Sequence, residues 1–152
     1  MPKPNDVVSQ YVTAFTSLTP NNMDALLAAV DDDIFFSDPF NKTTGKPAFT
    51  AIFDHMFETC IDPGFDVTDV AYSATNDNKI AYLRWRMTGK INGWPHTALD
   101  FEGMTEVHIG DNGLISAHID HWDSASQLFA KLPVIGALLR PIMARFVVKV
   151  PR

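Results

Sequence analysis

The sequence has little cysteine and no long apolar run: Cys60 is the only cysteine among its 152 residues. A single cysteine cannot form an internal disulfide, and it suits a reducing compartment. The segment from Met1 to Asp6 lacks the apolar stretch of a secretory signal, and no run approaches the ~18 apolar residues that span a bilayer. We therefore expect a soluble, cytoplasmic protein.

Motifs for metal, nucleotide and nucleophile chemistry are missing as well. The sequence has no glycine-rich phosphate loop, no Gly-x-Ser-x-Gly nucleophile elbow, no His-Glu-x-x-His and no cysteine pair. His118 and Asp120 offer two metal ligands, but no third ligand stands at a typical spacing. These absences predict a site that uses neither a metal nor a cofactor.

Acidic residues are absent after Asp123, although the chain holds 18 Asp and Glu. Residues 1–130 carry seven basic side chains against those 18 acids, a net charge of −11, whereas residues 131–152 sum to +5. An acidic body argues against nucleic acid as the main partner. For the basic tail we expect a helix folded over the cavity mouth or packed in a dimer, with its basic residues on the acidic body, and a helix lying on an anionic membrane is the less favoured alternative.

The residues that are present predict one domain with a large interior or a lined cavity. The chain is 46% hydrophobic, and eleven of its 17 aromatic residues are phenylalanine. Apolar residues recur first at helical spacing. The predicted helices run from a cap at Asn5 through Leu18, from Thr19-Pro20 to Val30 before a turn at Asp31–Asp33, and from Gly45 to Cys60.

After a predicted turn at Asp62–Gly64 the apolar period changes to two, which indicates strands. The predicted strands lie near residues 65–73, 79–89, 95–109 and 114–122, after a short one at 34–38. Asp123-Ser124 then caps a short helix, and Pro133 and Gly136 precede a last helix near 137–149.

Helices followed by a meandering sheet are typical of the α+β class. We expect the N-terminal helices to wrap a curved, mostly antiparallel sheet into a cone with an internal cavity. Residues 1–131 would form this domain, and residues 132–152 a C-terminal apolar-basic helix packed on it.

Two short acidic segments are candidates for a site in that cavity. Asp38 shares strand parity with Phe36, so it should face the interior; the alternative is that it caps the turn at Pro39. In the segment from 114 to 122, one face carries His118, Asp120 and Trp122, and the opposite face is more apolar. Periodicity alone leaves open which of these faces is buried.

These elements and motifs resemble the nuclear transport factor 2-like superfamily, which includes SnoaL-like polyketide cyclases and ketosteroid isomerases. Phe36-Ser-Asp-Pro-Phe40, followed by Gly45, is similar to the strand end where the isomerases carry their general base, which places Asp38 there. The resemblance also implies that Tyr11 stabilises an oxyanion and that Trp122 lies in the pocket. Trp122 in the pocket turns its neighbours His118 and Asp120 inward.

Asp120 is similar to the acid on the last strand of limonene-epoxide-hydrolase-like proteins. Two positions depart from the known activities. Thr105 stands where the isomerases have a protonated aspartic acid, and Arg84-Trp85-Arg86 lacks the acid of the epoxide hydrolases' Arg-x-Asp.

The resemblance implies a cofactor-free isomerase, cyclase or hydrolase that acts on an apolar ketone-, polyketide- or steroid-like molecule by acid–base catalysis. The alternative is a non-catalytic ligand-binding or protein-interaction member, and a homodimer paired through the sheet is expected in either case. The implied catalytic residues are Asp38, Asp120, His118 and Tyr11, and the implied substrate-binding residues are Phe36, Phe53, Phe57, Trp85, Thr105, Val107 and Trp122.

Overall fold

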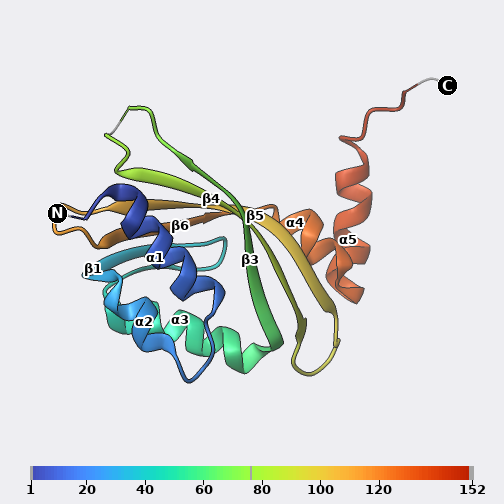
Figure 1. Cartoon of the computed structure of the whole chain (residues 1–152). Coiled ribbons are helices and arrows are strands. Elements are labelled where there is room, and N and C mark those ends of the chain that lie inside the picture. Colours follow the sequence, from blue (N-terminus) through green and yellow to red (C-terminus); the bar gives the residue numbers. More distant parts are fainter. Residues whose placement is uncertain (1, 76, 151–152) are drawn as a thin grey trace.

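The computed structural model describes residues 2–75 and 77–150. It is an α+β fold in which a curved six-stranded sheet carries helices on its inner side (Figure 1). The helices are α1 (Pro4–Thr16), α2 (Met23–Ala28), α3 (Lys46–Thr59), α4 (Ser124–Gln127), the 3-10 helix η1 (Phe129–Lys131) and α5 (Pro133–Ala144). The strands are β1 (Val30–Ser37), β2 (Lys42–Thr44), β3 (Cys60–Tyr72), β4 (Ile80–Ile91), β5 (Ala98–Ile109) and β6 (Ile115–His121).

The sheet order is β2-β1-β6-β5-β4-β3, so the first long strand lies next to the last one. β1 and β6 run parallel, and every other neighbouring pair is antiparallel. This pairing of β1 with β6 brings residues around position 38 close to residues around position 120. The predicted fold class, a curved and mostly antiparallel sheet with N-terminal helices, is confirmed.

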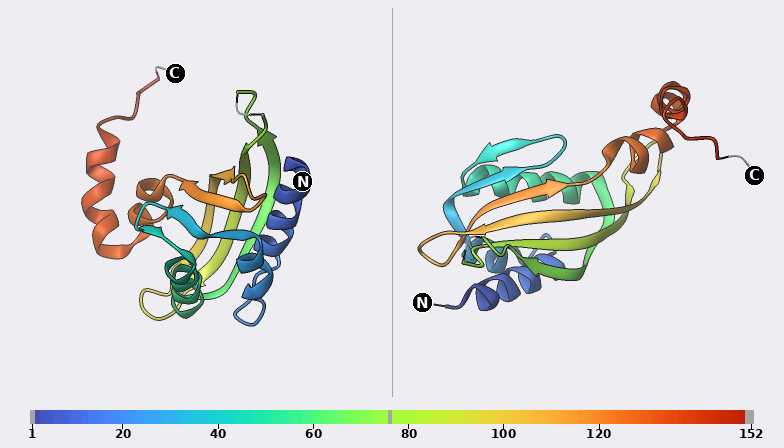
Figure 2. Two further views of the ribbon diagram at one scale, coloured as in Figure 1. Left: turned by 90° about the vertical axis from the view of Figure 1, so that its left-hand side faces the viewer. Right: turned by 90° about the horizontal axis from the view of Figure 1, so that it is seen from above.

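The three N-terminal helices lie on one side of the sheet, where α1 packs on β3 and α3 packs on β1 and β3 (Figure 2). Their apolar sides form the main core with the inner side chains of the strands. The largest fully buried members include Tyr11, Phe49, Leu26, Ile34, Leu83, Ile115 and His118. A second cluster of Trp85, Met87, Leu99 and Phe101 continues this interior along the sheet.

The predicted first and second helices differ from the structure at their ends. α1 begins at Pro4, with proline in its first turn, so Asn5 lies inside the helix and is not its cap. α2 begins only at Met23, because the Asn22 side chain folds back to accept a hydrogen bond from the Thr19 amide at 2.5 Å. The predicted turn at Asp31–Asp33 is wrong: these residues belong to β1, whose register with β6 shifts between Val30 and Phe35.

The predicted turn at Asp62–Gly64 is also wrong, since β3 continues through it. The register of β3 against β4 shifts between Ile61 and Gly64, and Asp62 has a φ of 49°, so this segment is a bulge. Pro63 fits here because β3 is an edge strand and needs fewer amide donors.

The last helix begins earlier than predicted. Pro133 is its first residue, and Gly136 lies inside it instead of breaking the chain. A Cβ atom at Gly136 would collide with the Ala130 carbonyl oxygen, so glycine lets α5 approach η1 closely. α5 lies beyond the end of the sheet, and η1 is the element that it chiefly contacts (Figures 1 and 2). Among the described residues, no helix is long and apolar enough to cross a membrane.

Candidate functional site

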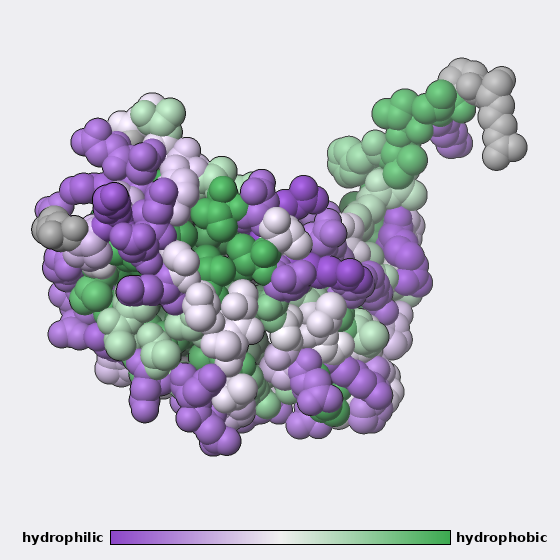
Figure 3. All heavy atoms as spheres, viewed as in Figure 1, coloured by the Kyte–Doolittle hydropathy of each residue, from purple (hydrophilic) through white to green (hydrophobic). Residues whose placement is uncertain are grey.

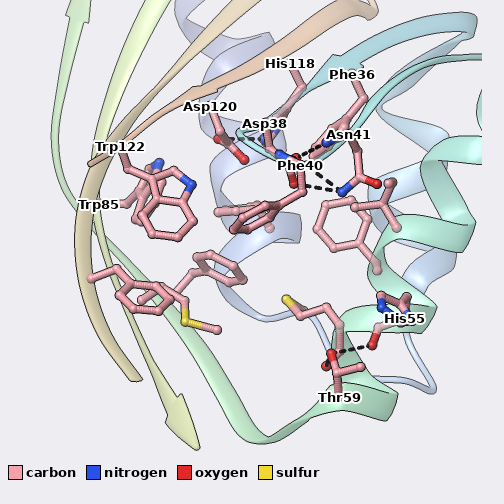
Figure 4. Close-up of a pocket in the computed structure, with 17 residues that line it drawn as sticks. Phe36, Asp38, Phe40, Asn41, His55, Thr59, Trp85, His118, Asp120 and Trp122 are labelled. Carbon is pink, nitrogen blue, oxygen red and sulfur yellow. Dashed lines mark hydrogen bonds and ion pairs between the residues drawn. The ribbon is translucent and has the colours of Figure 1, made fainter. Parts of the chain in front are cut away.

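A pocket of about 210 Å³ opens between α3, the turn after β1 and the inner face of the sheet (Figure 4). Most of its wall is aromatic or aliphatic, which is the usual make-up of a small-molecule site. Its lining residues are Phe15, Phe36, Asp38, Phe40, Asn41, Ile52, Phe53, His55, Met56, Thr59, Phe65, Trp85, Met87, Phe101, His118, Asp120 and Trp122.

A bulge in β6 decides which of its side chains face this pocket. Ile109 pairs with Ile115 whereas His108 pairs with Ala117, so Ser116 is one extra residue in β6. The extra residue shifts the alternation by one position. Ile115 therefore joins the core, and His118 and Asp120 also point inward, although strict alternation places Ile115 on the opposite face.

The inward side chains of β4, β5 and β6 are joined to α1 by a chain of four hydrogen bonds. Trp85 Nε1 donates to Thr105 Oγ1 at 2.8 Å, and Thr105 Oγ1 donates to Asp120 Oδ1 at 2.5 Å. Asp120 Oδ1 lies 3.0 Å from His118 Nε2, and His118 Nδ1 lies 2.6 Å from the Tyr11 hydroxyl. Four side chains, Trp85, Thr105, His118 and Tyr11, thus fix the carboxylate of Asp120 directly or through one another.

Tyr11 determines which nitrogen of His118 carries the proton. Burial raises the pKa of Tyr11 well above its ordinary value, and the negative charge of Asp120 raises it further. The phenol therefore keeps its proton and donates a hydrogen bond to His118 Nδ1. His118 then carries its hydrogen on Nε2 and donates to Asp120 Oδ1.

His118 and Asp120 differ in exposure, and this difference separates their roles. The His118 side chain is 1% exposed and stacks on Phe36 with ring centroids 5.1 Å apart. The Asp120 side chain is 17% exposed and lines the pocket. Both bonds to Asp120 end on Oδ1, and no hydrogen bond from the described residues reaches Oδ2. Asp120 thus presents a carboxylate oxygen, Oδ2, that is available to a ligand in the pocket.

Asp38 has both features that the sequence left open. Its Oδ1 accepts hydrogen bonds from the amides of Phe40 and Asn41 at 2.7 and 2.6 Å, so it caps the turn after β1. The same residue lines the pocket, and Figure 4 shows its carboxylate at the same end as Asp120. Two acids therefore border one aromatic space.

The structure places four of the seven predicted substrate-binding residues on the pocket wall, namely Phe36, Phe53, Trp85 and Trp122. The other three do not line it. Phe57 packs at the margin of the core, Val107 is fully buried in it, and Thr105 contacts Asp120 from behind. Tyr11 also lies outside the pocket wall, because its hydroxyl is directed to His118.

Several pocket-lining residues on the strands and at the end of α3 were not predicted from the sequence. Phe65, Met87 and Phe101 contribute to the far wall from β3, β4 and β5, and their alternation with exposed neighbours was a usable signal. His55 and Thr59 lie at the end of α3 (Figure 4). His55 is largely exposed, and nothing in its spacing on the helix distinguishes it from a solvated residue.

The ionisable side chains that line the pocket are acids and histidines, without a lysine or arginine. Its lining includes the carboxylates of Asp38 and Asp120 and the imidazoles of His55 and His118, but neither lysine nor arginine. Within the described parts of the chain, no group of three His, Cys, Asp or Glu side chains is arranged to hold a metal ion.

Comparison with known proteins places this chain in a family. The model of the SnoaL-like domain matches residues 8–118, from the first helix to His118. The chain belongs to the SnoaL-like domain family. The match covers β1 and Asp38 just after it but stops before Asp120 and Trp122, and no curated protein matches the chain by sequence.

Solved structures show the same fold at low identity, as expected for a SnoaL-like domain. A putative polyketide cyclase from Pseudomonas putida KT2440 is 16% identical with a TM-score of 0.64, covering 81% of this chain and 93% of that one. A protein of ketosteroid isomerase-like fold from Catenulispora acidiphila, solved in complex with trimethylamine, is 17% identical with a TM-score of 0.67, covering 84% and 94%. An epoxide hydrolase/cyclase-like enzyme, SalBIII, with a role in pyran ring formation in salinomycin, is 14% identical with a TM-score of 0.65, covering 80% and 91%.

Proposed function

We propose that this SnoaL-like protein binds a small apolar carbonyl compound in the pocket and moves a proton on it without a cofactor, as an isomerase, cyclase or hydrolase. The observation that carries the proposal is the arrangement around Asp120. One of its oxygens is held by Thr105 and His118, and the carboxylate borders an aromatic pocket. A carboxylate fixed in this way is suited to general-base catalysis.

In this proposal Asp120 is the base. Its position is fixed by two side-chain donors on Oδ1, which leaves Oδ2 to approach a carbon-bound proton next to a carbonyl. Tyr11 is then a positioning residue, since it acts on Asp120 only through His118. Asp38 accepts two backbone hydrogen bonds that hold its carboxylate at the turn after β1, so we assign it to orienting the substrate or to a second proton transfer.

The reaction also needs a hydrogen-bond donor for the oxyanion that forms when the proton leaves. The Thr105 hydroxyl and the Tyr11 hydroxyl already donate to Asp120 and His118. The indole N–H of Trp122 has no hydrogen-bond acceptor among the described residues, and Trp122 lines the pocket. We propose Trp122 as the donor.

Exchange of carbon-bound hydrogen with solvent deuterium tests this proposal without knowledge of the product. Mono- and bicyclic ketones, which suit a cavity of about 210 Å³, would be incubated with the protein in D2O and followed by NMR. We expect exchange at carbons next to the carbonyl. Asp120→Asn should slow it by about 10²- to 10⁴-fold, the usual contribution of a general base, while ligand binding persists.

Asp54→Asn, an exposed acid on α3 outside the pocket, is the matched control and should leave exchange unchanged. Ketones that bind, as judged by tryptophan fluorescence, but never exchange would contradict the catalytic proposal. Equal exchange by the native protein and Asp120→Asn would contradict the assignment of the base.

A second candidate function is the binding of a cationic amine without catalysis. Eight aromatic rings and two carboxylates line the pocket, and no lysine or arginine balances them. Aromatic faces and carboxylates both attract ammonium groups. The related fold from Catenulispora acidiphila was solved with trimethylamine, which supports this alternative.

Choline and its neutral analogue 3,3-dimethylbutanol have nearly the same shape and differ in charge. If the pocket serves an amine, choline should bind at least about tenfold more tightly by calorimetry, since a desolvated cation–π contact contributes ~2 kcal/mol. Equal affinities would contradict this candidate and leave the carbonyl proposal in place.

Two further expectations also stay proposals. We propose that two copies pair through the outer face of the sheet, where Arg86 and Asp100 form an ion pair at 2.6 Å and Arg84 lies 3.8 Å from Glu102. We propose the cytoplasm as the compartment. Sedimentation equilibrium of the full chain tests the first of these.

A further inference from the structure

The C-terminal segment exposes an unusual amount of apolar surface. Val134, Leu138 and Ile142 of α5 are 66%, 68% and 56% exposed. The chain beyond α5 continues this surface with exposed Phe146, Val147, Val148 and Val150. Figure 3 shows the segment as a hydrophobic arm that projects from a mostly hydrophilic body. A surface of this kind marks a docking site.

The rest of the protein does not cover this surface. α5 is attached on one side only, where Gly136 is buried against η1 and Arg140 Nη1 donates to the Ala130 carbonyl at 2.9 Å. Residues 138 and 142 are four apart and therefore share another side of the helix, which faces away from η1. No residue of α5 lines the pocket, so the helix is not a cover for its mouth.

The exposed apolar residues of the body are more scattered along the chain than those of the arm, which disfavours a second copy as the partner. The large hydrophobic residues exposed on the described part of the body lie on four separate segments. Ile61 and Val70 are on β3, Met104 is on β5, and Phe40 and Trp94 are in two different loops. Two arms packed in parallel would bring Arg145 and Lys149 of both copies close, with no acidic residue after Asp123 to balance them.

An anionic bilayer complements the arm in both charge and polarity. Residues 131–152 carry five basic side chains and no acid. Charged lipid headgroups attract such residues, and the acyl region below them accepts the apolar side chains. Repulsion from the acidic body is limited, because salt screens exposed charges over about 8 Å.

We propose that α5 and residues 145–150 form a docking segment that lies in the interface of an anionic membrane. The helix has 12 residues and is therefore roughly 18 Å long, too short to cross a bilayer core of about 30 Å but suited to lie in its surface. The ring of Phe129 in η1 packs against the ring of the pocket residue Phe40, with centroids 5.9 Å apart. Docking of the neighbouring α5 therefore holds the pocket near the membrane.

Vesicle flotation of the full chain tests the proposal. The probes are vesicles of pure phosphatidylcholine and vesicles with 30% phosphatidylserine, about 10² nm across, at low and high salt. We expect flotation with the anionic vesicles at low salt and at least about a tenfold loss at 0.5 M NaCl. The double variant Arg145→Glu/Lys149→Glu should lose binding by a similar factor.

Two matched double substitutions distinguish the contribution of the apolar side of α5 to membrane binding from a general effect of added negative charge. Leu138→Glu/Ile142→Glu should abolish flotation. Ala137→Glu/Ala144→Glu adds the same charge on a different side, since residues seven apart share a side, and should retain most binding. Circular dichroism and thermal unfolding check that all variants fold.

Two results would overturn the proposal. One is the absence of flotation of the folded native chain with anionic vesicles at low salt. The other is a dimer in sedimentation equilibrium that Leu138→Glu/Ile142→Glu dissociates, which would assign the arm to a second copy. Neither result bears on deuterium exchange in the pocket, so this proposal and the proposed reaction fail independently.

Discussion

At the scale of single residues, the site is organised around the hydrogen bonds of Asp120. Thr105 links it to Trp85 on one side, and His118 links it to Tyr11 on the other. The family resemblance predicted that these residues belong to the site, but it placed Tyr11 and Thr105 in direct contact with a ligand. The structure uses both to hold Asp120, because the bulge at Ser116 turns His118 and Asp120 toward them.

Two threonine-to-valine substitutions should have opposite effects on stability. Thr105→Val removes a donor to Asp120 and leaves the buried Trp85 N–H without an acceptor, so we expect a loss of about 1–3 kcal/mol in unfolding free energy. Thr43 Oγ1 is buried without a hydrogen-bond partner among the described residues. Thr43→Val should therefore be neutral or stabilising. Urea unfolding measures both, and equal losses would contradict the prediction.

The raised pKa of Tyr11 predicts a stability that falls at high pH. The unfolded chain begins to lose the phenol proton near pH 10, the ordinary value, whereas the folded chain keeps it. Above pH 10 the loss of this proton stabilises the unfolded state relative to the folded state. The unfolding free energy therefore falls by up to about 1.4 kcal/mol per pH unit.

Tyr11→Phe removes this titration, so its stability deficit relative to the native chain should shrink between pH 9 and pH 11. The measurement is urea unfolding across that range. Tyr72→Phe is the control: burial also raises the pKa of Tyr72, but this residue is only partly buried, so the change should be smaller. A deficit that stays constant with pH would contradict the role of Tyr11 as a buried donor.

At the scale of elements, the inner face of the sheet is shaped where β4, β5 and β6 meet. Gly103 on β5 lies against Trp85 and Trp122, both of which line the pocket. A Cβ atom there would come within 2.6 Å of the Trp85 ring and 2.8 Å of Trp122 Cβ. The absence of a side chain on one strand thus provides the space for two tryptophans from its neighbours.

Gly103→Ala should therefore destabilise the protein by about 1–3 kcal/mol and weaken ligand binding in the pocket. Gly64→Ala on β3 is the matched control. Its Cβ atom would meet nothing closer than 3.8 Å and its φ is not positive, so the change should be neutral or stabilising by up to about 1 kcal/mol. Thermal unfolding and tryptophan fluorescence distinguish the two variants. Similar behaviour of both would show that the contacts of Gly103 do not shape the pocket.

At the scale of the whole molecule, the C-terminal arm is attached to the body mainly through the contact of α5 with η1. α5 makes its main contacts with η1, and its apolar side chains are mostly exposed. The arm therefore adds little to the core that lies between α1, α2, α3 and the sheet.

A chain that ends at Leu132 should fold and unfold cooperatively like the full protein. We expect its unfolding midpoint to differ by less than about 4 °C, the equivalent of roughly 1 kcal/mol for a domain of this size. Differential scanning calorimetry of both chains measures this. A large drop in the midpoint would show that the arm packs on the body.

Much of the architecture could be predicted because apolar periodicity changes from helical to alternating near residue 65, and burial enforces both patterns. Element ends were less predictable. The strand through Asp31–Asp33 and the continuation of β3 through Asp62–Gly64 depend on pairing with β6 and β4, which lie far away in sequence. Local turn propensities at these acidic and Pro-Gly segments therefore gave the wrong result.

The α+β class, the acidic body with a basic apolar tail, and the two acids near strand ends follow from the order of the residues alone. The folded chain was needed to show that β1 lies beside β6, that a bulge turns His118 and Asp120 inward, and that Thr105, and Tyr11 through His118, hold Asp120. The difference lies in the separation along the chain over which each property is set. Periodicity and charge are local properties of the chain, whereas register, bulges and buried hydrogen bonds depend on which segments pair, from the neighbouring strands β5 and β6 to the Tyr11–His118 bond across 107 residues.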